Sequence, residues 1–181
     1  MITEGTTEAL TTDYAYIMND DGTISVSGYT GSDTDLTVPG LIDGYVVTGI
    51  ADHAFEANAD IKSITLPNGL ITIGESAFSD CSSLTTVVIP DTVGTIRRGA
   101  FISCTALTTL DIPASVTEIM EEAFTGCAAL KDLTVESSTV EFTNWWVDTD
   151  EIPSDLTITC PKDSKIAAWA EKNNVATEPL S

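Results

Sequence analysis

Three cysteines of this chain are equally spaced, and cysteine can bind metals or form disulfides. Cys81, Cys104 and Cys127 follow one another at a constant 23-residue step. A metal site needs ligands that converge on one point. Residues that repeat at a fixed step in a stacked structure form a line instead, and their parallel Cβ vectors do not suit a disulfide. We therefore expect small buried thiols that contribute to packing, and no metal site.

The remaining candidates for catalysis are one histidine and one further cysteine. His53 is the only histidine, and no cysteine or serine motif lies near it, so we interpret it as a surface or edge residue. Cys160 lies outside the phase of the other cysteines and can be a free thiol near the C-terminal end. No glycine-rich phosphate loop follows any strand-like segment. The sequence therefore predicts no catalytic residues, no enzyme activity and no cofactor.

Acidic residues gather in three short segments, which suggests a calcium hypothesis. The segments are Asn19–Asp21, Asp33 with Asp35, and the stretch from Asp148 to Asp155. Calcium takes six to eight oxygen ligands, and none of the segments has the order of an EF-hand loop. Solvated turns are the simpler interpretation, and the last segment is the strongest of the three candidates.

An internal repeat accounts for the spacing of the cysteines. The dipeptide Ala-Phe recurs in the same phase at Ala54-Phe55, Ala77-Phe78, Ala100-Phe101 and Ala123-Phe124. Apolar positions keep the same step at Ile50, Ile73, Ile96 and Ile119, and at Ile61, Leu84, Leu107 and Leu130. A fixed period of 20 to 50 residues in many columns indicates a solenoid of stacked coils.

Within one coil, such as residues 81–103, the apolar positions predict two extended legs and a third, helical side. The first leg, Leu84–Ile89, ends at Pro90, where a strand tolerates proline. The second leg is Val93–Ile96, and a helical turn then places Phe101 in the core. One coil cannot bury its apolar face alone, but stacking at about 4.8 Å buries it continuously.

Segments before and after the regular coils are expected to cap the solenoid, whose ends would otherwise expose strand edges. A turn signal between Tyr14–Met18 and Thr23–Tyr29 predicts a hairpin. Leu41–Val46 is expected to form a bent loop or a second hairpin, and Ser164–Asn173 a helix with Ser164 as its N-cap. We expect one domain that comprises a tail (1–13), an N-terminal cap (14–49), regular repeats (50–138), a degenerate repeat (139–160), and a capping helix with a tail (161–181).

Two adjacent tryptophans lie in the degenerate repeat. Continuing the phase places Trp146 in the column of Ala123, and Val147 in that of Phe124. Trp146 is therefore expected to pack inward and Trp145 to be exposed. An exposed tryptophan beside acidic residues can stack on a sugar or anchor a protein partner. The alternative is that both tryptophans fill the last coil.

The outward positions of the first leg form two rows of mostly short polar side chains, which are our main candidate binding residues. The rows are Ser63, Thr86, Thr109 and Asp132, and Thr65, Val88, Asp111 and Thr134. Such residues suit β-structure in general, but concave solenoid faces are also the usual partner-binding surfaces. We expect a shallow, weakly acidic groove for peptides or glycan hydroxyls. A separate row, with Arg98 between Glu75 and Glu121, is interpreted as structural.

The charge of the chain excludes some partners. Twenty-eight Asp and Glu residues face seven Lys and Arg, for a formal net charge of −21. This field repels phosphate backbones and anionic membranes, so nucleic-acid binding is not expected. No stretch approaches 18 apolar residues, so we expect no membrane insertion. The first residues lack the pattern of a signal peptide. The protein is then either cytoplasmic, or its signal and anchor lie outside these residues.

The repeat pattern I-x-x-x-A-F-x-x-C-x-x-L-x-x-L-x-I-P-x-x-V-x-x-I resembles the BspA-like class of leucine-rich repeats. The entry segment GYTGSDTDLTVPGLIDGYVVTGIADHAF and the closing segment CPKDSKIAAWAEKNNV resemble that family's ends. The resemblance covers about residues 14 to 175. It implies a right-handed leucine-rich-repeat solenoid on or shed from bacterial cells, and some members are adhesins for host matrix proteins or other microbes. Asn58, at the first cysteine position, and the coil from Thr139 to Asp155 depart from the pattern.

Three functions remain open. The leading hypothesis is a non-catalytic protein- or glycan-binding module of a bacterial cell-surface or secreted protein, adhesin-like and monomeric. The second is a structural spacer of a larger surface protein, with no specific ligand. An enzyme is third, and it would need a pocket that contains His53 or clustered acids.

Overall fold

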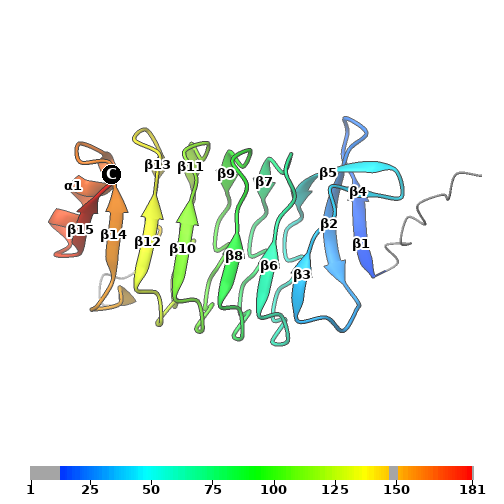
Figure 1. Cartoon of the computed structure of the whole chain (residues 1–181), viewed down its shortest axis with the longest axis horizontal. Coiled ribbons are helices and arrows are strands. Elements are labelled where there is room, and N and C mark those ends of the chain that lie inside the picture. The colour runs from blue at the N-terminus through cyan, green and yellow to red at the C-terminus, as the bar shows by residue number, and fades with distance from the viewer. Residues whose placement is uncertain (1–12, 147–150, 181) are drawn as a thin grey trace, which may run out of the picture.

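The chain forms an elongated stack of coils, as the repeat predicts (Figure 1). The computed structural model describes residues 13–146 and 151–180. The C-terminal strand and helix lie at one end of the stack, and the first hairpin lies at the other (Figure 1). Most of the expected N-terminal tail, together with Val147 and Ser181, lies outside the described residues.

One long side of the stack is made of short parallel strands, one from each coil. They form two sheets, and no strand ladder joins β8 to β10 in the part of the chain that the structure describes. We call the outward surface of these strands the strand face. Its elements are β3 (Asp35–Thr37), β6 (Ser63–Thr65), β8 (Thr86–Val88), β10 (Thr109–Ile112), β12 (Asp132–Val135), β14 (Thr157–Cys160) and β15 (Ala176–Pro179).

The second side is a single eight-stranded sheet that runs from the N-terminal hairpin through the other leg of the regular coils to the strand Glu141–Phe142. Its regular strands are very short, since the leg turns a corner after each inward isoleucine. The elements are β1 (Tyr14–Met18), β2 (Ile24–Tyr29), β4 (Leu41–Ile42), β5 (Tyr45–Ile50), β7 (Thr72–Ile73), β9 (Thr95–Ile96), β11 (Glu118–Ile119) and β13 (Glu141–Phe142).

The third side of each coil consists of tight turns rather than the expected helical turn. The N–H of Phe78 donates to the carbonyl of Ala100 in the next coil at 2.8 Å, whereas the N–H of Ser79 donates to Ser76 in its own coil at 3.1 Å. Ser76 and Asp80 have φ angles of 50° and 59°. A right-handed helix does not accommodate such left-handed residues, so the backbone bonds alternate between turn and neighbouring coil.

The core contains a stack of phenylalanine rings, one from each regular coil. Phe55, Phe78, Phe101 and Phe124 are all buried. Successive ring centroids are 5.2, 5.3 and 6.0 Å apart, with interplanar angles of 3°, 6° and 13°. The phased Ala-Phe dipeptide therefore builds one continuous apolar column, as expected from stacking of equivalent positions.

Both predicted caps are confirmed. Strands β1 and β2 form an antiparallel hairpin, and β4 pairs with β5 as a second hairpin. Helix α1 (Lys165–Lys172) begins after Ser164, whose side chain accepts a hydrogen bond from the N–H of Ala167. Strand β15, which was not expected, follows the helix and pairs in parallel with β14.

Candidate binding surface

The strand face presents the two predicted rows, which are in register within each of its two sheets. Ser63 lies opposite Thr86 and Thr65 opposite Val88, while Thr109 lies opposite Asp132 and Asp111 opposite Thr134. All eight side chains are exposed or half-buried, and the residue between each pair points into the core. This alternation follows from the period of two in a strand. The rows extend beyond the prediction to Asp35 and Thr37 on β3 and to Thr157 and Thr159 on β14.

Hydrogen bonds and charges make the strand face polar and weakly acidic. The hydroxyl of Ser63 donates to Asp35 at 2.5 Å, and this bond is the main cause that lowers the pKa of Asp35. Further along the stack, at the same end of the strands, Lys131 pairs with Asp155 at 3.0 Å and lowers the pKa of that carboxyl. Val88 is 49% exposed and places an apolar side chain on the strand face. Hydroxyls and carboxylates on a rigid sheet can bind the polar groups of peptides or sugars through hydrogen bonds.

The expectation that Trp145 is exposed is wrong. Trp145 is 0% exposed and Trp146 only 5%. In the regular coils the N–H of Phe101 donates to the carbonyl of Ala123, 22 residues later. The same step from Phe124 would reach Trp146. The N–H of Phe124 donates to the carbonyl of Trp145 instead. The irregular coil therefore has one residue fewer at this point, and Trp145 rather than Trp146 takes the alanine position. Both indoles pack against Phe124.

The tryptophans instead close the C-terminal end of the core. Trp145 meets Trp169 of α1 edge to face at a centroid distance of 5.0 Å, and Trp146 stacks on Trp169 at 5.9 Å. This cluster continues the phenylalanine column and joins it to the cap, so the alternative of two packing tryptophans holds. Trp145 is removed from the candidate binding residues.

The degenerate repeat also shifts the register of the last coil. Continuing the phase of the regular coils places Leu156 opposite Leu133, whereas Ile158 lies opposite Leu133 in the structure. The register is therefore shifted by two residues. Side chains alternate between the two faces of a strand, so a shift by two keeps each residue on the face that the phase predicts. Both Leu156 and Ile158 are therefore still buried.

The phased cysteines are buried free thiols, as predicted. Each Sγ donates to the carbonyl of the phenylalanine one coil earlier: Cys81 to Phe55, Cys104 to Phe78 and Cys127 to Phe101, all at 3.1 Å. Burial raises the pKa of Cys81 to about 12. The pKa of Cys160, which is also a buried free thiol, is raised by burial. Nucleophilic chemistry needs a thiolate, so Cys81 and Cys160 are suited to packing.

His53 and the acidic segments are the remaining candidates for a reactive site. The exposed His53 ring lies 3.0 Å from Glu56 through Nδ1, and its φ of 60° marks a turn. In residues 13–146 and 151–180, no three His, Cys, Asp or Glu side chains lie close enough to share a metal ion. Asp148 and Asp150 of the third acidic segment lie outside the described residues.

Arg98 bridges two neighbouring coils, but one predicted partner is wrong. Its guanidinium lies 3.9 Å from Glu75, as expected, and 3.0 Å from Glu122 rather than Glu121. Glu122 has a φ of 62°, and this left-handed backbone changes the direction in which its side chain leaves the chain. The exposed row stays a structural feature. Beside it lies a hollow of about 310 Å³, bordered by Met120 and Phe142.

The sequence model of the BspA type leucine rich repeat region matches residues 47–157 in six copies. The chain belongs to the BspA-type leucine-rich repeat family. Among the described residues of this BspA-type protein, no helix has the length and apolar character needed to cross a bilayer. No curated protein matches the chain.

Several solved structures that are similar to this BspA-type protein come from bacteria. A leucine rich repeat protein of T. pallidum is 25% identical, with a TM-score of 0.76, over 84% of this chain and 71% of that one. A leucine-rich repeat protein from Bacteroides capillosus is 32% identical, with a TM-score of 0.61, over 67% and 92%. A leucine rich cell surface protein from Faecalibacterium prausnitzii is 28% identical, with a TM-score of 0.60, over 91% and 45%.

Proposed function

We propose that this chain is a non-catalytic protein- or glycan-binding module of a bacterial cell-surface or secreted protein, and that it binds through the strand face. The observation that carries the proposal is the pair of outward rows, which are in register from β3 to β8 and again from β10 to β14 and include Thr86, Thr109, Val88 and Asp111. Their side chains project from strands whose inward residues are locked in the core. A rigid surface of this kind loses little conformational freedom when it binds.

Family membership supports the proposal at a coarser level. Extended faces of solenoids are commonly used to bind proteins, and one similar structure is described as a cell surface protein. The net charge of −21 favours solubility and disfavours nucleic acid. We accordingly propose an extracellular or cell-surface location. Host matrix proteins, other surface proteins or glycans are the proposed partners, and the protein is proposed to act as a monomer.

A structural spacer is the second candidate, and the continuous core favours it. The aromatic column from Phe55 to Trp169 joins the regular coils to the C-terminal cap. A stack of this kind can hold another domain at a fixed distance. Such a spacer would bind nothing through the strand face.

Capture from serum, matrix extract and bacterial surface extract tests the proposal. The immobilised chain is compared with a Thr86→Lys/Thr109→Lys variant, which places two long charged side chains in one row. A Ser82→Lys/Thr105→Lys variant adds the same charge at exposed turn positions of the same two coils. A ligand retained by the parent and the control, and lost by the first variant, supports the strand face. Equal background retention by all three favours the spacer.

A further inference from the structure

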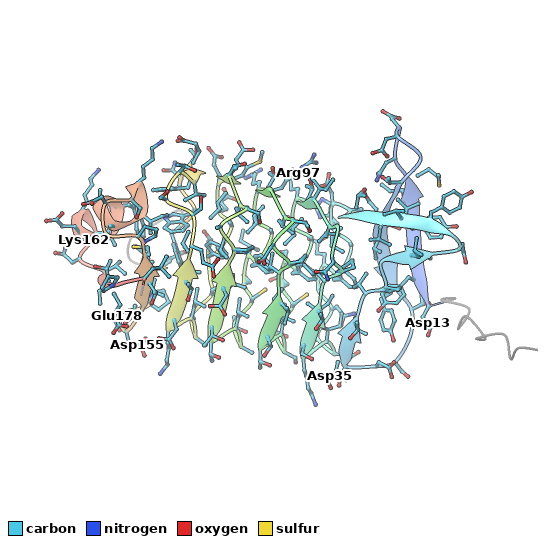
Figure 2. The ribbon with its side chains drawn as sticks, turned by 45° about the horizontal axis from the view of Figure 1, so that its top comes forward. Asp13, Asp35, Arg97, Asp155, Lys162 and Glu178 are labelled. Carbon is cyan, nitrogen blue, oxygen red and sulfur yellow. The ribbon has the colours of Figure 1, made fainter. Side chains whose placement is uncertain are left out.

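A second candidate surface is a groove at the N-terminal end of the second side. It has a volume of about 490 Å³, within the range of ligand sites. One wall is the turn after β1, the floor comes from β2, β5 and β7, and the other wall holds Asp52 and Arg97. Figure 2 shows Arg97 on the edge of the solenoid opposite to that of Asp35 and Asp155, so this groove is separate from the strand face.

The floor of the groove is low because two buried glycines form part of it. A Cβ on Gly49 would lie 2.4 Å from the hydroxyl of Ser25, and a Cβ on Gly74 would lie 2.6 Å from the backbone of Ala51. At either position a side chain would force its neighbours to move. The hollow is thus built by close approach of backbone, which glycine permits.

Hydrogen bonds hold both walls in place. The Asn19 amide donates to Thr48 at 3.2 Å and accepts from Ser25 at 3.0 Å, which fixes the turn to the sheet. Across the groove, Asp52 accepts the N–H of Glu75 at 2.8 Å and lies 3.5 Å from Arg97. The groove is therefore formed before any ligand arrives, which reduces the entropic cost of binding.

The lining of the groove combines carboxylates, which are spread along it, with two exposed isoleucine side chains. Asp20, Asp21 and Asp52 supply carboxylates, and Arg97 is the one cation among the lining residues. The surrounding chain adds to this field, since residues 13–61 contain nine Asp and Glu and no Lys or Arg. Ile17 and Ile71 are each 54% exposed in the same lining.

This distribution of charge suits an extended ligand better than an ion. In the described part of the chain the carboxylates are too far apart to share a metal. Separate carboxylates and exposed isoleucines instead match a chain whose basic and apolar side chains alternate. We propose that the groove binds a short basic peptide segment of a partner protein, with Lys or Arg side chains at the three aspartates and apolar side chains at Ile17 and Ile71. This proposal does not depend on the strand face.

Fluorescence anisotropy with a labelled peptide, Lys-Ile-Lys-Ser-Lys-Ile, tests the groove. A Thr72→Lys variant places a cation at the groove and should weaken binding at least about tenfold, because like charges are juxtaposed. Arg97→Gln removes the cation that pairs with Asp52 and should tighten binding. Thr105→Lys adds the same charge as Thr72→Lys at an exposed turn outside the lining, and should change affinity less than about twofold.

Control peptides separate the two parts of the recognition. Exchange of Lys for Glu should abolish binding, and exchange of Ile for Ser should weaken it. Circular dichroism of each variant establishes that it is folded. Absence of binding to the folded parent overturns the proposal. Equal weakening by Thr72→Lys and Thr105→Lys also overturns it, because attraction to the acidic molecule as a whole would then explain the affinity. Weaker binding by Arg97→Gln would contradict the assigned charge preference.

Discussion

Truncation of Phe101 to alanine should destabilise the protein more than truncation of Phe55, although both phenylalanines occupy the same repeat position. Phe101 is 0% exposed and has a stacked ring on each side, at 5.3 and 6.0 Å. Phe55 is the first ring of the column and stacks on Phe78 alone. The comparison therefore measures what a second stacked neighbour contributes in the middle of a solenoid.

The magnitude follows from burial and ring contacts. Truncation of a buried phenylalanine typically costs about 3–5 kcal/mol, and an aromatic pair contributes about 0.5–1.5 kcal/mol beyond its buried area. Phe101 loses two such pairs and Phe55 one, so we expect about 4–5 kcal/mol for Phe101→Ala and about 3 kcal/mol for Phe55→Ala. Either loss is a large part of the about 5–15 kcal/mol that stabilises a typical protein.

Urea denaturation provides the assay, with circular dichroism for the β-structure and tryptophan fluorescence for the C-terminal aromatic cluster. Extrapolation to water gives the free energy of unfolding, and unchanged slopes would show that the unfolding reaction is the same. A loss below about 1 kcal/mol for Phe101→Ala would refute the stacked core. A larger loss for Phe55→Ala than for Phe101→Ala would refute the assigned order of the column.

The thiols and the exposed ion pairs give two further predictions. Because burial raises the pKa of Cys81 from 9.0 to about 12, the unfolded chain loses this proton first. The free energy of unfolding should therefore fall above pH 9, by up to about 1.4 kcal/mol per pH unit for this group. A Cys81→Ala variant with the same alkaline slope would contradict this reasoning. Arg98→Ala should leave the urea midpoint nearly unchanged, because the ion pairs of Arg98 with Glu75 and Glu122 are exposed. A marked fall in the midpoint would show that these ion pairs are a main source of stability.

The regular part of the fold could be predicted from sequence because stacking puts equivalent residues in contact. Phe78 meets Phe101 only if the backbone repeats without insertion, so the constant phase of Ala-Phe already implies the column. The outward rows followed from the same phase and the alternation of a strand. The helix after Ser164 had its own local signal in the N-cap and the apolar spacing.

Prediction was wrong where the phase changes by an amount that the residues do not reveal. One residue is missing before Trp145, and this moves the side chain from the expected surface into the core. Arg98 pairs with Glu122 instead of Glu121 because Glu122 has a left-handed backbone. This conformation belongs to the turn and cannot be inferred from the phase of the repeat. The groove near Arg97 had no sequence signal, because it depends on how the first hairpin meets β5 and β7.

The most direct test of the proposed function is the affinity of the parent and of the Thr86→Lys/Thr109→Lys variant for a partner purified after capture. Titration by calorimetry would compare both with the Ser82→Lys/Thr105→Lys control. If the strand face binds the partner, the first variant should lose at least about tenfold in affinity, because two long charged side chains obstruct the row, while the control retains it. Equal affinity in all three proteins would contradict the assignment of the strand face as the binding surface.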